Sequence, residues 1–166
     1  MDPLYKISVV IHVLSAITWV GGVLSMGAVA IPAARQLPPA QRSAIIGAIG
    51  WRFRPIGWTC LALLVLTGSY MAWSWGATWA NLFDLSFFQR GAQYRTLGYK
   101  LIAVTLMLAV SGYHDWFLGP QSAAPDIAAD SPEAALMRKR AGRLGRATGI
   151  LVLVISVLAV FVARPW

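Results

Sequence analysis

The chain has 166 residues, of which 58% are hydrophobic and only 12% are charged. Apolar runs recur at lengths that match a hydrocarbon core of about 30 Å, so the composition excludes an ordinary soluble domain and predicts an integral membrane protein. The formal net charge is +8, but no nucleic-acid-binding motif accompanies it, so we expect membrane lipid and not nucleic acid as the partner of the basic residues.

Four apolar runs predict four transmembrane helices. The runs cover residues 4–34, 55–75, 97–118 and 147–162. Arg143 and Arg146 can snorkel, so we expect the last helix to start earlier than its apolar run. Helices satisfy their own backbone in lipid, which offers no hydrogen-bond partner. The predicted fold is all-α, a single four-helix transmembrane bundle over residues 1–166 with no soluble domain.

His12 interrupts the first apolar run. Ionisable groups at bilayer depth usually face a bundle interior, a cavity or a bound ion, so this residue is a candidate ligand. Helical spacing places four further residues on or near its face, namely Ser15, Trp19, Gly22 and Met26. The alternative is a histidine bonded to a neighbouring helix. We expect Gly21 and Gly22 to pack closely against that helix.

The basic residues sort by loop, which indicates topology. Nine of the 14 Lys and Arg residues flank the first and third connections, namely Arg35, Arg42, Arg52, Arg54, Arg138, Lys139, Arg140, Arg143 and Arg146. The other five lie on the opposite side, namely Lys6, Arg90, Arg95, Lys100 and Arg164. The positive-inside rule then predicts that the first and third connections are cytoplasmic and both termini are outside. The expected location is the inner (plasma) membrane of a prokaryote.

The second apolar run opens with an anchor for the membrane interface. Residues 51–58 combine tryptophans at the headgroup level, two arginines and Pro55 in the first helical turn. Alternatively, one of these arginines holds the acid group of a cofactor or a lipid. Cys60, the single cysteine, excludes an intrachain disulfide and reads as a small apolar filler. Residues 81–94 are expected to lie on the membrane surface or to cap the bundle.

Several stretches match a known family together and in order. They are His12 with residues 19–22, residues 52–54 leading to residues 66–68, Lys100-Leu101 leading to Tyr113-His114, and the terminal residues 162–166. On these residues the chain resembles a short member of the copper resistance protein D (CopD) family, which is similar to the HemJ-type membrane protoporphyrinogen oxidases. The resemblance implies a haem b-binding membrane oxidoreductase that acts on a tetrapyrrole or quinol-like substrate.

The resemblance links the histidine of the first helix to haem, which carries over to His12. We expect Trp19 to line the site, and Arg95 and Lys100 to lie where the propionates emerge. At 1.5 Å per residue, His12 lies about 12 Å and His114 about 25 Å from the outer end of their helices, so they do not sandwich one haem. The outer-half candidates for a second ligand are Met71, Met107 and Lys100.

Two other interpretations use the same residues. In the first, the thioethers of Met26, Met71 or Met107 join His12 to hold Cu(I), which would make the chain a copper-binding or copper-transport and resistance protein. In the second, the bundle is a non-catalytic subunit of a larger membrane complex. A homo-oligomer is also compatible with the sequence.

Overall fold

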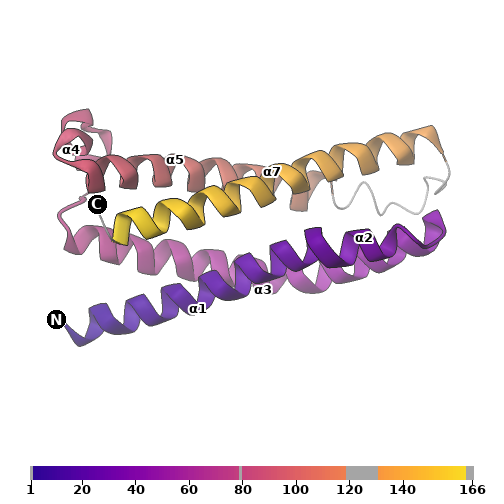
Figure 1. Ribbon diagram of the computed structural model, residues 1–166, viewed down its shortest axis with the longest axis horizontal. Coiled ribbons are helices and arrows are strands. Elements are labelled where there is room, and N and C mark those ends of the chain that lie inside the picture. Colours follow the sequence, from indigo (N-terminus) through magenta and orange to yellow (C-terminus); the bar gives the residue numbers. More distant parts are fainter. Residues whose placement is uncertain (1, 79, 119–130, 164–166) are drawn as a thin grey trace.

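The structure, a computed structural model, describes residues 2–78, 80–118 and 131–163 (Figure 1). These residues form helices and connections without any strand, which confirms the predicted all-α fold. In chain order the elements are α1 (Pro3–Ser25), the π-helix η1 (Met26–Ala30), α2 (Ile31–Ala34), α3 (Pro39–Ser74), the 3-10 helix η2 (Asn81–Phe83), α4 (Leu85–Gln89), α5 (Ala92–Tyr113), the π-helix η3 (His114–Leu118) and α7 (Pro132–Ala163).

Four helical segments are long and apolar enough to cross a membrane. They are Pro3–Ala34, Pro39–Ser74, Ala92–Leu118 and Ala135–Ala163. The prediction of four spans in an integral membrane protein is therefore confirmed. Two helices begin much earlier than their apolar runs, α3 at residue 39 instead of 55 and α7 at residue 132 instead of 147. An apolar run marks only the part of a helix that lies in the hydrocarbon core, and the helix itself continues beyond it. The 36 residues of α3, for example, span about 54 Å, which is longer than the core is thick.

Prolines explain an irregularity of the first span. Pro32 has no N–H to donate, and its ring would clash with the carbonyl one turn earlier. The π-helix η1 lies directly before it and widens the turn, which lets the helical path continue into α2. Pro55 lies inside α3 at the start of its apolar part and does not end the helix.

The four spans form two pairs. α1 packs along α3, and α5 packs along α7, while contacts between the pairs are sparser and mainly join α7 to α1 and η1 (Figure 1). The start of α1, α4 and the end of α7 lie together at one end of the bundle, which we name the terminal end. The opposite end, where α2 turns into α3 and α7 begins, is the loop end. The first residue of α1, Pro3, and the last residue of α7, Ala163, thus lie on one side, as four spans require.

Two buried clusters hold the bundle together. All four spans contribute to the central core, which contains Trp19, Cys60, Leu61, Met107 and Val152. Cys60 is a free, buried residue of this core, which agrees with its predicted role as apolar filler. At the terminal end, Phe87 of α4 is 1% exposed and packs with Ala77, Leu97 and Val162. The segment after α3 therefore caps the bundle, although its Phe83 and Leu85 are exposed.

Candidate functional site

A polar row lies on the inner face of α1. The buried residues of α1 are Ser8, Ser15 and Trp19, and His12 lies between the two serines on the same face and is half-buried. Their spacing of three to four residues is that of one helical stripe. The helical face predicted from the position of His12 is therefore the face that α1 turns towards the bundle.

A side-chain hydrogen bond ties His12 to α3, and the backbone of Leu64 on the same helix also interacts with its ring. Its Nδ1 lies 2.9 Å from the hydroxyl oxygen of Thr67. The Thr67 hydroxyl donates its single proton to the backbone carbonyl of Leu63, so towards His12 it can only accept. The hydrogen bond with Thr67 thus assigns the proton to Nδ1, the tautomer that keeps the lone pair on Nε2. Histidines that ligate metals commonly have this arrangement, in which the non-ligating nitrogen donates to a second group.

Gly68 explains why the imidazole can approach α3 so closely. A Cβ atom at Gly68 would lie 3.1 Å from Cε1 and 3.7 Å from Nδ1 of His12. Even an alanine at this position would require the imidazole ring to shift by a few tenths of an ångström. The two consecutive residues Thr67 and Gly68 thus act together, one by accepting a hydrogen bond and the other by leaving room for the ring.

The third span adds a cation to this region. Lys100 of α5 is half-buried and lies within electrostatic range of His12. Arg95 lies in the first turn of α5 and is exposed, closer to the terminal end than Lys100. Trp19 lies two turns deeper than His12, about 10 Å along α1, inside the central core. The region around His12 therefore has a cation within electrostatic range and an indole two turns deeper along α1.

The methionines proposed as ligands lie at different levels. Met71 is half-buried, one helical turn beyond Thr67 towards the terminal end and on the same side of α3. Met107 is buried beside Trp19 in the central core, and its sulfur accepts a hydrogen bond of 3.7 Å from Ser111. Met26 lines an apolar cavity of about 380 Å³ with Gly22 and Phe53. Of these three methionines, Met71 alone lies on the face of α3 that carries Thr67, the hydrogen-bond partner of His12.

The structure keeps the two histidines apart. His114 and Trp58 both bond to Asp115, so the two residues lie close together. Trp58 precedes Thr67, the partner of His12, by nine positions on α3, which is about 13 Å of helix. This separation agrees with the expectation that they do not sandwich one haem. Across the described ranges, no group of three or more His, Cys, Asp or Glu side chains could hold a metal ion.

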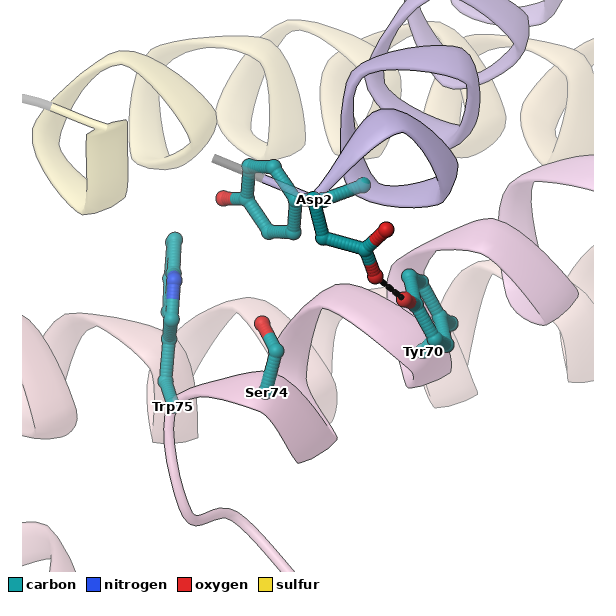
Figure 2. Close-up of a pocket in the computed structure, with 5 residues that line it drawn as sticks. Asp2, Tyr70, Ser74 and Trp75 are labelled. Carbon is teal, nitrogen blue, oxygen red and sulfur yellow. Dashed lines mark hydrogen bonds between the residues drawn. The ribbon is translucent and has the colours of Figure 1, made fainter.

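An open pocket lies at the terminal end above His12. It has a volume of about 290 Å³ and is lined by Asp2, Tyr5, Tyr70, Ser74 and Trp75. The Tyr70 hydroxyl donates a hydrogen bond of 3.0 Å to Asp2, and Figure 2 shows this pair on one side of the pocket and Trp75 on the other. Tyr70 is three residues beyond Thr67, so the pocket opens at the terminal end of the same α1–α3 seam.

Sequence reasoning missed a second polar cluster, near the loop end of α5. The Trp58 indole N–H donates to one oxygen of Asp115 at 2.9 Å, and His114 Nδ1 lies 2.9 Å from the other oxygen. The Trp58 and Trp116 rings lie 4.4 Å apart. An acidic residue at the end of an apolar run was the available signal, but its partner lies 57 positions earlier in the chain. We name Arg54, Trp58, His114, Asp115 and Trp116 the loop-end cluster.

Comparison with known proteins identifies one family. A family model described as copper resistance protein D (CopD) matches residues 47–162, which is more than half of the chain. The matched part includes Thr67, Gly68, Lys100 and the loop-end cluster, and it begins after His12. Among curated proteins and solved structures, the comparison found no match to the chain. The four apolar spans and the extent of the family match together show that this integral membrane protein belongs to the copper resistance protein D family.

Proposed function

We propose that the protein is a membrane redox protein that binds one b-type haem in the terminal half of the bundle, with His12 Nε2 as the iron ligand. The observation that carries this proposal is the hydrogen bond from His12 Nδ1 to Thr67. It fixes the ring and leaves the lone pair on Nε2, which is the form of histidine that metals bind. When bound, haem supplies one-electron chemistry.

The donor set favours haem over a bare copper ion. A porphyrin provides four nitrogen ligands of its own, so one protein imidazole is enough to hold the iron. Copper takes all its ligands from the protein, and soft thioethers would be expected among them. Met71 is the methionine nearest to Thr67 along α3, whereas Met107 is buried in the central core. The residues around His12 therefore fit haem better.

The neighbouring residues have roles that suit this cofactor. Lys100, half-buried and within electrostatic range of His12, would pair with a propionate, and the exposed Arg95 would lie near the second one. Trp19 would form the floor of the site. The contacts between the two helix pairs are sparse, which suits a flat apolar group that enters between them. The resemblance to the HemJ type suggests a tetrapyrrole or quinol-like substrate.

Copper is the second candidate, because the family that the chain belongs to is described as copper resistance protein D. In that case His12 and Met71 would be the first two ligands, with Met107 reachable only if its packing in the core changes. Such a protein would bind or transport copper and would need no porphyrin.

The proposal includes an orientation and partners. The loop end carries most of the basic residues, so the positive-inside rule supports a cytoplasmic loop end, with both termini outside the inner membrane of a prokaryote. Lipid covers much of the exposed apolar surface of the spans. A second copy of the chain or a larger membrane complex would cover a further part of it.

An absorption spectrum of the purified protein tests the proposal. We expect a Soret band in the wild type, its loss in His12→Ala, and its retention in the matched variant His114→Ala. The reason is that His114 lies at another level and has a carboxylate partner. Protein that stays without haem after haem supplementation, but binds one copper that His12→Ala abolishes, would establish the copper function instead. If neither group binds, a non-catalytic subunit is the remaining interpretation.

A further inference from the structure

Arg54 lies between two tryptophans that come from different helical segments. Its guanidinium carbon is 5.8 Å from the ring centre of Trp51 on α3 and 5.6 Å from that of Trp116 in η3. A planar guanidinium stacks on indole faces, which leaves the N–H donors at its edge available. The stacked position reduces the freedom of a side chain that would otherwise sample many rotamers.

One of the two rings that contact Arg54, that of Trp116, is itself held in place. Trp116 packs on Trp58 with ring centres 4.4 Å apart, and a Cβ atom at Gly112 would come within 3.1 Å of the Trp116 ring. Trp58 in turn donates its indole N–H to Asp115. The contacts join α3, α5 and η3, so the guanidinium is positioned by parts of both helix pairs.

No carboxylate pairs directly with Arg54 in the part of the chain that the structure describes. One oxygen of Asp115 lies 2.9 Å from His114 Nδ1, and its second oxygen accepts from Trp58. Asp115 acts on Arg54 through space and not through a contact of ion-pair length. No described residue occupies the N–H edge of Arg54, so this edge is available to an anion from outside the chain.

The position of Arg54 indicates the source of that anion. Arg54 directly precedes Pro55, where the apolar part of α3 begins, so it lies at the level of lipid headgroups. The half-exposed His114 belongs to the same cluster, and its ring could add a second polar contact at this level. We propose that the loop-end cluster is a specific site for one anionic phospholipid, whose phosphodiester binds the guanidinium of Arg54 through two N–H donors.

Phosphatidylglycerol binding to the full-length protein tests this site. Native mass spectrometry would measure lipid retained by protein purified in detergent, with phosphatidylcholine as the zwitterionic comparison. Arg54→Lys keeps the charge and removes both the stack and the paired donors, and we expect about tenfold weaker binding of phosphatidylglycerol. Arg52→Lys is the matched control, because Arg52 is exposed and has no ring contact of this kind in the structure. It should bind as the wild type does.

A second variant tests the same site in case Arg54→Lys does not fold. Trp116→Leu leaves Arg54 in place and removes one face of the stack, and several-fold weaker binding is expected. Equal losses in Arg52→Lys and Arg54→Lys, or no loss in Arg54→Lys, would overturn the proposal. Displacement of the lipid by millimolar inorganic phosphate would also overturn it, since the site would then bind a soluble anion. Resistance to phosphate supports the lipid site.

Discussion

The two histidines of the chain use the same ring nitrogen for a hydrogen bond, but one bonds to a neutral group and the other to a carboxylate. Each has its Nδ1 in a hydrogen bond of 2.9 Å. His12 bonds to a neutral hydroxyl on a different helix, Thr67, whereas His114 bonds to the carboxylate of its sequence neighbour Asp115. The same residue type therefore has a different kind of partner at each of two levels of the bundle.

The comparison shows how position decides what a histidine can do. The His12 pair lies inside the α1–α3 seam, with a buried serine on either side of His12 along α1. The His114 pair lies next to a stacked arginine and three interfacial tryptophans. A neutral partner suits a ligand that presents a lone pair in the bundle, while a charged partner suits a network that joins helices at the headgroup level.

The largest expected effect concerns the close contact between α1 and α3 on the loop-end side of Trp19. A Cβ atom at Gly22 would overlap the Phe53 ring, whereas at Gly21 it would meet nothing within 4 Å. Close packing is thus found for Gly22, and the same expectation for Gly21 is wrong because that residue is exposed. Gly22→Leu should cost more than about 3 kcal/mol, the upper range for overpacking, and should disturb the neighbouring Arg54 more than His12.

Thermal unfolding in detergent would measure this difference. Gly21→Leu is the matched control and should change the free energy of unfolding little, because its side chain would face lipid. Equal melting temperatures for Gly22→Leu and the wild type would mean that the Phe53 ring moves aside and that the seam is not closely packed there.

The next effect separates the loop-end cluster from the His12 site. Asp115→Ala leaves the Trp58 indole N–H and His114 Nδ1 without their acceptor. The cost of leaving such groups unsatisfied is about 1–3 kcal/mol. Asp115→Asn keeps one oxygen for a donor and should lose less.

The readout is the melting temperature together with the haem spectrum. We expect Asp115→Ala to lower the melting temperature and to leave the Soret band unchanged, because the His12 site lies about 13 Å away along α3. If Asp115→Ala folds fully but binds no haem, the two sites are coupled.

The sequence predicts most of the fold, for a physical reason. Apolar runs report the thickness of the bilayer, so the four spans follow from composition alone. The early start of α3 does not follow, because the polar residues before its apolar run form a helix outside the hydrocarbon core. The early start of α7 does follow, because Arg143 and Arg146 can snorkel. The surface that His12 faces was predictable, since helical spacing puts Ser15 and Trp19 beside it.

The partners across helices were not predictable. Thr67 and Asp115 lie on other elements than the residues they bond, His12 and Trp58 respectively, and local spacing carries no information about such pairs. In the sequence alone, the stretch Leu66-Thr67-Gly68 carries meaning only through the family resemblance. In the structure, Thr67 and Gly68 acquire a physical meaning as the acceptor and the space for one imidazole ring.

The smallest expected effect tests the feature on which the proposed function depends. Thr67→Val preserves the branched shape and removes the acceptor of His12 Nδ1, and hydrogen bonds between membrane helices average about 0.6 kcal/mol. The loss of stability should be of this order, and Thr67→Ser should recover most of it. The spectrum should respond more clearly than the stability, because without its acceptor the imidazole loses its fixed tautomer and orientation. Thr67→Val could instead keep the Soret position and the reduction potential of the wild type. The hydrogen bond of Thr67 would then not belong to the haem site and would be a purely structural contact between α1 and α3.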